Sequence, residues 1–204
     1  MKLVNNSRHR IAREAATLLY FGAEKEYKQA KLRAAKILAS RFLPTNLEVA
    51  IELDRIAEEI EGSLKKRRLV KMRLEAMIIM KILEDFHPLL IGSVWRGTIR
   101  QESDIDITLF HDIPSEIVDV LRKNNLKITK SQWITVTERG NPLSSLHVYL
   151  ETSGKQKAEI VIRSLEQKGE KRKCEIFGDE LKGLTSQELK KLLEENPAEK
   201  FIPC

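Results

Sequence analysis

Two aspartates separated by a single residue, Asp104 and Asp106, are the side chains of this sequence best suited to chemistry. In a strand, residues i and i+2 point to the same face and lie about 6.5 Å apart. Two carboxylates this close repel each other unless a cation lies between them. Hard oxygen ligands with no histidine or cysteine beside them favour Mg²⁺ or Mn²⁺ over Zn²⁺. The pair therefore predicts a divalent-metal site.

A turn ahead of the aspartates has the features of a phosphate site. The apolar run at residues 89–91 ends in Gly92 and Ser93. Gly92 permits close backbone approach or a positive φ, and Ser93 is expected to cap a short helix whose free N–H groups receive phosphate oxygens. Arg96, one turn on, is expected to donate to the same phosphates. Residues 89–110 thus predict a combined metal and phosphate site.

This arrangement resembles the signature of the DNA polymerase β-like nucleotidyltransferase superfamily. The stretches GSVWRGT and SDIDITLF look most like the archaeal CCA-adding enzymes and related archaeal predicted nucleotidyltransferases. The family's third carboxylate lies on a later strand between apolar residues, and Glu159, within AEIV, matches that place. HVYL at residues 147–150 resembles the stretch that precedes it. The resemblance covers residues 89–163, and the chain is far shorter than an archaeal CCA-adding enzyme, with an N-terminus that has no counterpart there.

The resemblance implies a metal-dependent nucleotidyltransferase of the EC 2.7.7 type, which moves a nucleoside monophosphate from an NTP, such as ATP, to an acceptor hydroxyl. Asp104 and Asp106 would hold one Mg²⁺ or Mn²⁺ against the triphosphate. A second ion, shared with Glu159, would activate the attacking hydroxyl. The glycine, serine and arginine of the turn would hold the β and γ phosphates and stabilise the departing pyrophosphate.

Three functions remain open at this point. The acceptor is expected to be RNA, in particular a tRNA-like RNA. A protein side chain or a small molecule is the alternative acceptor for the same chemistry. A non-catalytic module that binds nucleotide or RNA is the third possibility, and the presence of all three carboxylates argues against it.

The charge of the chain is unevenly distributed. Residues 1–85 carry 18 Lys+Arg against 12 Asp+Glu, whereas residues 86–165 carry 10 against 9 and residues 166–204 carry 8 against 9. A basic extension beside a catalytic domain is typical of an RNA-binding enzyme, although ordinary solvated helices also look like this. The densest basic cluster comprises Lys65, Lys66, Arg67 and Arg68. Cations near a helix N-terminus oppose the helix dipole unless an anion meets them, so RNA phosphates and a solvated basic face both remain possible there.

At 204 residues the chain can form one catalytic domain plus a smaller helical unit. Its 42% hydrophobic and 32% charged residues indicate a globular protein. No apolar run approaches the roughly 20 residues that span a bilayer, and the first ten residues lack the apolar core of a signal peptide. We therefore expect a cytoplasmic protein with no membrane partner.

The elements that must position the site predict an α+β fold, with a mixed sheet and helices preceded by an N-terminal helical bundle or arm. Helical spacing runs through residues 7–60, with breaks at Gly22 and at residues 43–46. The expected domains are a helical region at 1–62, a catalytic domain at 63–165 and a C-terminal extension at 166–204. The inward face of the helix expected over residues 63–85 comprises Leu64, Leu74, Met77, Ile78 and Leu83.

Within the catalytic domain we expect a helix at residues 114–124 and strands at 126–137 and 145–151, joined through residues 140–142. The strand at 156–163 carries Glu159. If it pairs with the strand of the two aspartates, about 4.8 Å away, three carboxylates converge. A last helix is expected at residues 185–194. Four other residues are expected to be structural, namely His111, His147, Trp95 and Trp133.

Overall fold

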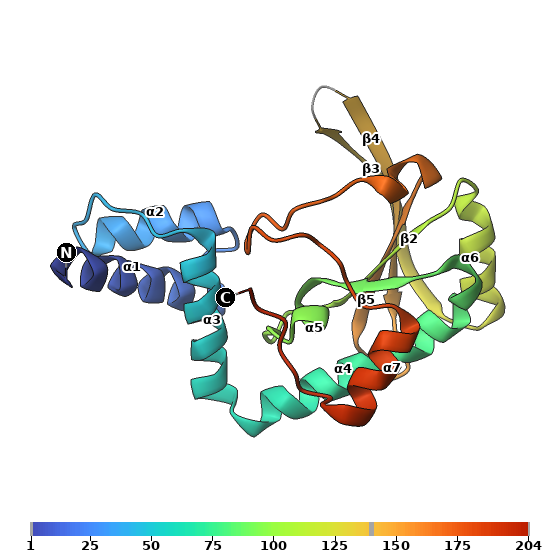
Figure 1. Cartoon of the computed structure of the whole chain (residues 1–204), viewed down its shortest axis with the longest axis horizontal. Coiled ribbons are helices and arrows are strands. Elements are labelled where there is room, and N and C mark those ends of the chain that lie inside the picture. The colour runs from blue at the N-terminus through green and yellow to red at the C-terminus, as the bar shows by residue number, and fades with distance from the viewer. Residues whose placement is uncertain (1, 139–140, 204) are drawn as a thin grey trace. The chain divides into compact units, whose positions relative to one another are not determined.

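The computed structural model describes residues 2–138 and 141–203, and the side chains of residues 7–137 and 142–203 (Figure 1). The chain splits into two compact units. The N-terminal unit comprises Met1–Lys65, Lys173–Glu180 and Ile202–Cys204, and the sheet unit comprises Lys66–Arg172 and Leu181–Phe201. The α+β class and the mixed sheet predicted from the sequence are confirmed. The domain boundaries at residues 62 and 165 stay a prediction.

Three helices form the N-terminal unit: α1 (Lys2–Tyr20), α2 (Tyr27–Ile37) and α3 (Asn46–Glu61). The predicted breaks lie between these helices, but the stretches outside the helices are longer than predicted, at residues 21–26 and 38–45, and Asn46 belongs to α3. Thr45 begins α3 with a capping box, in which its hydroxyl accepts from the Glu48 N–H at 3.1 Å and the Glu48 carboxylate accepts from the Thr45 N–H at 2.6 Å. Gly62, at a φ of +53°, ends α3. The buried core of this unit is built largely from alanine and branched aliphatic side chains of the three helices.

A five-stranded mixed sheet forms the centre of the other unit, in the order β1-β2-β5-β4-β3. The strands are β1 (Leu89–Ile91), β2 (Ile105–Phe110), β3 (Lys127–Glu138), β4 (Asn141–Glu151) and β5 (Lys157–Arg163). Strands β2 and β5 are parallel, and the other neighbours are antiparallel. The predicted link at residues 140–142 is wrong for Asn141 and Pro142, because β4 begins at Asn141, four residues before its predicted start, and these two residues pair with Glu138 and Thr137 of β3. Gly140 lies outside the described residues.

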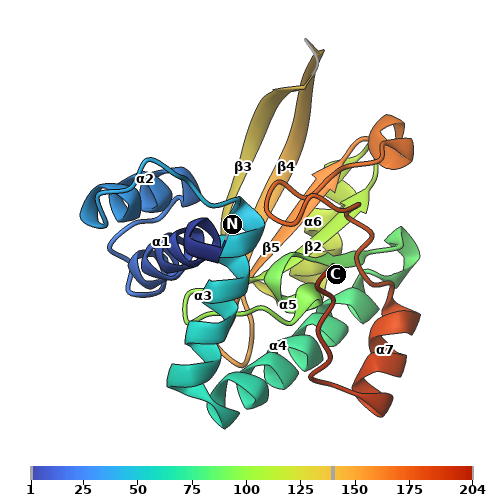
Figure 2. The ribbon, with the colours of Figure 1, turned by 60° about the vertical axis from the view of Figure 1, so that its left-hand side comes forward.

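One face of this sheet is buried. Period-two alternation turns Ile105, Ile107 and Leu109 of β2 inward, each fully buried, together with Ile160 and Ile162 of β5. These side chains share a core with α4 (Ser63–Ile82), α6 (Pro114–Lys123) and α7 (Ser186–Glu195). Figures 1 and 2 both show α4 and α7 along the same side of the sheet. The alternate residues of β2 and β5 therefore face away from this core.

The prediction of which α4 side chains face inward is wrong for three of the five residues. Leu64, Leu74 and Ile78 are exposed at 64%, 51% and 53%. Leu83 is fully buried as predicted, and Met77 is partly buried. The buried face instead comprises Leu69, Met72, Ala76, Ile79 and Met80. The helix carries apolar side chains on both sides, so its sequence alone does not select the side that meets the sheet. It also ends at Ile82, three residues before the predicted end, and a 3₁₀ turn (Glu84–Phe86) follows.

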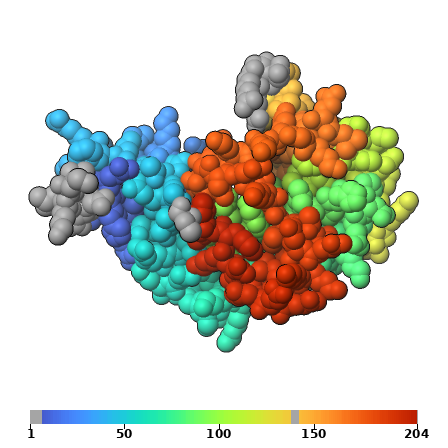
Figure 3. Space-filling model, viewed as in Figure 1, coloured from blue at the N-terminus to red at the C-terminus, as the bar shows by residue number. Residues whose placement is uncertain are grey.

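A buried arginine fastens α4 to the chain around α5 (Gly92–Arg96) and to the C-terminal segment. The guanidinium of Arg73 is fully buried and donates to the carbonyls of Val94 and Trp95 at 3.1 and 2.8 Å. It also donates to the carbonyls of Pro197 and Glu199 at 2.8 and 2.9 Å. Burial lowers the pKa of Arg73 to about 10, which leaves it charged at neutral pH. Figure 3 shows the segment after α7, in red, on the surface of this unit.

None of the described helices is both long enough and apolar enough to cross a membrane.

The orientation of α4 can be tested with two neighbouring isoleucines. Ile79 is 1% exposed and Ile78 is 53% exposed. Ile79→Ala leaves a cavity in the core and should lower the free energy of unfolding by about 2–4 kcal/mol. Ile78→Ala should lower it by less than about 1 kcal/mol. Urea denaturation of both variants measures the difference, and equal losses would contradict the orientation described here.

Candidate active site

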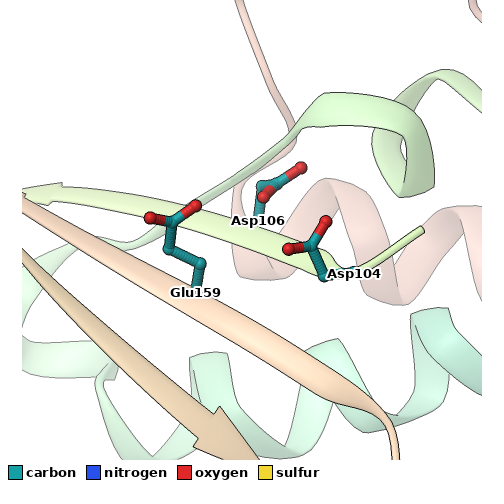
Figure 4. Close-up of side chains that lie close together, drawn as sticks. All are labelled: Asp104, Asp106 and Glu159. Carbon is teal, nitrogen blue, oxygen red and sulfur yellow. The ribbon is translucent and has the colours of Figure 1, made fainter. Parts of the chain in front are cut away.

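Three carboxylates meet on the open face of the sheet. Asp106 of β2 and Glu159 of β5 are direct partners across the parallel pair, and Asp104 lies just before β2 begins. One oxygen from each of the three lies within 4.8 Å of the other two. Figure 4 shows the Glu159 side chain extending from its strand towards the two aspartates. The sequence predicts that the three carboxylates converge if β2 pairs with β5, and the structure confirms both the pairing and the convergence.

The environment of these groups opposes their negative charge. Burial is the main cause that raises the pKa of Asp106 to about 8, and the charges of Asp104 and Glu159 add to it. Burial and the charge of Glu159 also raise the pKa of Asp104, against the lowering effects of its backbone hydrogen bond, Lys157 and Arg100. In the absence of a cation, Asp106 therefore holds its proton at neutral pH.

A divalent cation fits this donor set. The three side chains supply only carboxylate oxygens, the ligand type that Mg²⁺ and Mn²⁺ prefer. Two or more positive charges among the carboxylates would offset both their mutual repulsion and the free-energy cost of burying their charges. Asp104, Asp106 and Glu159 are therefore the residues that would hold such an ion.

Gly92 leaves the space that Asp106 needs. Ile91 pairs with Asp106 across β1 and β2, which brings the next residue, Gly92, beside the carboxylate. A Cβ atom at Gly92 would lie 2.0 Å from Asp106 Oδ2, and the φ of Gly92 is +71°. Both features expected of this glycine, a close backbone approach and a positive φ, are present.

Ser93 is not the helix cap that the sequence predicts. Helix α5 begins at Gly92, and Ile91 occupies the N-cap position without a side-chain hydrogen bond. The Ser93 hydroxyl donates to Ser103 Oγ at 3.1 Å, and Ser103 Oγ also accepts from the Arg100 N–H at 3.0 Å. These bonds fasten the start of α5 to the loop that leads into Asp104.

Arg96 lies in the same turn but is only 3% exposed. Its guanidinium donates to the carbonyl of Phe201 at 3.0 Å and stacks on the ring of Trp95, with 4.4 Å from Cζ to the ring centroid. The Phe201 N–H donates in return to the Arg96 carbonyl at 3.0 Å. A phosphate contact by Arg96 stays a prediction, because the structure shows this side chain engaged with the C-terminal segment.

Sequence reasoning missed two groups of residues around the carboxylates. Arg100 and Lys157 are close enough that their charges lower the pKa of Asp104. Lys157 lies two residues before Glu159 on β5, so period-two alternation alone could have placed it on this face. The other group is on β4, where His147 and Tyr149 both contact Glu159.

The remaining structural assignments had mixed outcomes. Trp95 is 5% exposed, as a packing residue should be, but Trp133 is 63% exposed, so its packing assignment is wrong. Trp133 lies on β3, one of the two edge strands of the sheet. The ring of His111 pairs with Glu116 at 2.8 Å and packs edge-on against Phe86, which fits the structural assignment.

One member of the basic cluster is unavailable to a partner. Lys65 is 3% exposed and forms an ion pair with Asp54, whose backbone carbonyl it also contacts at 3.2 Å. The negative charge beside Lys65 is therefore the Asp54 carboxylate of α3. The prediction of Lys65 as an RNA contact is wrong. Lys66 and Arg67 are exposed.

The known structures that this chain resembles include remote likenesses among RNA-modifying enzymes. No protein-family model and no curated protein matches the chain. Among solved structures, a cytoplasmic RNA terminal U-transferase is 16% identical, with a TM-score of 0.29, over 57% of this chain and 34% of that one. The Cid1 poly(U) polymerase is 14% identical, with a TM-score of 0.31, over 57% of this chain and 35% of that one. Cid1 in complex with a UTP analogue is 16% identical, with a TM-score of 0.31, over 55% and 36%. The chain thus spans about a third of the length of these structures, and superpositions this loose transfer no activity to it.

A side chain at Gly92 should destroy the cation site. Gly92→Ala places a methyl group against Asp106 Oδ2 and should weaken Mn²⁺ binding, measured by electron paramagnetic resonance, by at least about tenfold. Gly178→Ala is the matched control, because Gly178 has a φ of +77° and no atom within 4 Å of the added Cβ. Both variants should lose about 1 kcal/mol of stability from backbone strain. Equal Mn²⁺ affinities in the two variants would contradict the role given to Gly92.

The raised pKa of Asp106 predicts how stability depends on pH. The folded chain keeps a proton that the unfolded chain releases near pH 4, so the free energy of unfolding of the metal-free protein should fall as pH rises from about 4 to about 8. Asp106→Asn removes this titration. Relative to the variant, the wild type should lose at least about 1 kcal/mol between pH 5 and pH 8.5.

Urea denaturation in EDTA at the two pH values measures this difference. Asp119→Asn serves as the control, because the Asp119 side chain is 62% exposed on α6. Parallel pH dependences of the wild type and Asp106→Asn would refute the assignment of the titration to Asp106.

Proposed function

We propose that this chain is a polymerase β-like nucleotidyltransferase, which moves a nucleoside monophosphate from an NTP to an acceptor hydroxyl. The observation that supports it most is the meeting of one oxygen each from Asp106 of β2, Glu159 of β5 and Asp104, just before β2, within 4.8 Å of one another. Their combination with Gly92 and Ser93 at the end of β1 is the motif that resembles this superfamily.

In the proposed reaction the acceptor oxygen attacks the α-phosphorus of the NTP. The bond from that phosphorus to the bridging oxygen breaks, and pyrophosphate leaves. Two Mg²⁺ or Mn²⁺ ions at the three carboxylates would neutralise the triphosphate and lower the pKa of the attacking hydroxyl. Asp104 and Asp106 would hold these ions, and Glu159 would be the ligand nearest the acceptor hydroxyl.

The phosphate groups need positive partners from the chain itself. We propose Gly92 and Ser93 as the turn that borders them, as expected from the sequence. Arg96 would join them only by exchanging its bond to the Phe201 carbonyl. Arg100 and Lys157 are additional candidates, since both act electrostatically on Asp104.

RNA is the acceptor that we propose, on two grounds. The motifs resemble those of archaeal CCA-adding enzymes, a resemblance that would imply a tRNA-like RNA, and residues 1–85 carry the excess of basic residues. Within the basic cluster, the exposed Lys66 and Arg67 are the proposed phosphate contacts. Several other cations of the N-terminal unit are neutralised internally, such as Arg8 by Glu48 at 2.9 Å. The cytoplasmic location expected from the sequence stays a prediction.

The experiment that tests this function offers each α-labelled NTP, with Mg²⁺ or Mn²⁺, to a mixed pool of cellular RNA and protein. The wild type should place label in RNA, and the Asp104→Ala/Asp106→Ala protein should lose at least about 10³-fold of that activity. The surface variant Asp119→Asn should keep it. Incorporation into RNA should also weaken steeply with added salt.

Other outcomes would contradict parts of the proposal. Label in protein or in a small molecule would replace RNA as the acceptor class. Equal incorporation by the wild type and the double variant would refute the role of the carboxylates. NTP binding without any incorporation would indicate a non-catalytic binding module.

A further inference from the structure

The third carboxylate is held by side chains of the neighbouring strand. His147 Nδ1 lies 2.6 Å from Glu159 Oε1, and the side chains have exposures of 14% and 19%. The hydroxyl of Tyr149 lies beside the same carboxylate. Tyr149 is the direct cross-strand partner of Glu159 on β4, and His147 lies two residues earlier on the same face. Strand β5 lies between β4 and β2, so His147 and Tyr149 approach Glu159 from the side opposite β2, the strand that carries Asp106 and directly follows Asp104.

The direction of these bonds follows from their other partners. Gln132 Nε2 donates to the Tyr149 hydroxyl oxygen at 3.1 Å, so the single hydroxyl hydrogen of Tyr149 is left to donate to Glu159. Ser145 Oγ lies 2.9 Å from His147 Nε2. Whether His147 is neutral or charged, an ionised Glu159 can only accept, which assigns a hydrogen to Nδ1. The imidazole N–H of His147 and the hydroxyl of Tyr149 are thus both placed to donate to the Glu159 carboxylate.

A glutamate needs such support more than an aspartate does. It has an additional rotatable bond, and fixing it in one rotamer costs conformational entropy. The charge of Asp104 also repels Glu159. Two donors on the opposite side keep the longer side chain in the rotamer that meets the aspartates.

We propose that His147 and Tyr149 are positioning residues, which fix Glu159 in the orientation that shares a divalent cation with Asp104 and Asp106. The role of this cation in nucleotidyl transfer rests on the proposed function. The position of His147 and Tyr149 beside Glu159 follows from the pairing of β4 with β5 alone. Ser145 acts one step further out, because its hydroxyl fixes the imidazole ring.

The order Ser145, His147 and Glu159 is also that of a serine nucleophile with its base and carboxylate. Ser145 does not fit that role. It is 6% exposed in the middle of β4, so its hydroxyl is closed to a substrate. The chain of contacts therefore serves to orient Glu159.

The test measures Mn²⁺ binding by electron paramagnetic resonance without nucleotide, alongside kcat and KM for the NTP. His147→Ala should weaken the Mn²⁺ site that needs Glu159 by about 10–100-fold. His147→Asn should restore the affinity to within about threefold of the wild type, because the Asn amide nitrogen takes the place of Nδ1 as a donor. Tyr149→Phe should weaken the same site with its fold intact. His111→Ala is the control, since that ring pairs with Glu116 instead.

In turnover, His147→Ala should lower kcat and leave the KM for the NTP within about threefold, because Glu159 acts on the acceptor side. Wild-type Mn²⁺ affinity and kcat in both His147→Ala and Tyr149→Phe would overturn the inference, as would equal losses in His147→Asn and His147→Ala.

The failure of the proposed function gives a different result. In that case His147→Ala would still weaken a Mn²⁺ site that depends on Asp104 and Asp106, although no nucleotide is transferred. A wild type that binds no Mn²⁺ would overturn both.

Discussion

Repulsion among three carboxylates is the constraint on which the sheet unit depends. The parallel pairing of β2 and β5 places Asp106 beside Glu159, and Asp104 lies within reach of both. Burial is the main cause that raises the pKa of Asp106 to about 8, and the charges of the other two carboxylates add to it. A fold that keeps these groups together without a cation gives up stability to do so. Such an arrangement makes physical sense where a divalent ion binds, since the ion reverses the sign of the local electrostatics.

The surrounding structure counters this repulsion by fixing the backbone on both sides. The isoleucines of β2 and β5 anchor one face of the two strands in the core, so the acidic residues between them must face outwards. Gly92 gives Asp106 its room, and the bond from Ser93 to Ser103 holds the loop before Asp104. Arg73 links α4, α5 and the C-terminal segment through four carbonyls. Site geometry and core packing are therefore coupled through the same few segments of chain.

Local patterns in the sequence predicted much of this unit. Period-two alternation placed the aspartates on one face, and apolar flanks placed Glu159 on a strand, so the site followed once those strands paired. Contacts between distant segments were not predictable in this way. The burial of Arg96 depends on a carbonyl near the C-terminus, and the contact of His147 with Glu159 depends on strand register. Both sides of α4 are apolar, so the exposure of Ile78 depends on how the helix packs.

The most direct test of a cation site for nucleotidyl transfer is a crystal structure of the protein with MnCl₂ and a non-hydrolysable NTP analogue, with anomalous diffraction used to locate manganese. The account predicts anomalous density in contact with Asp104 and Asp106, with Glu159 beside it and the triphosphate bound at the same metal. Manganese found only elsewhere, or a triphosphate bound away from these carboxylates, would contradict it.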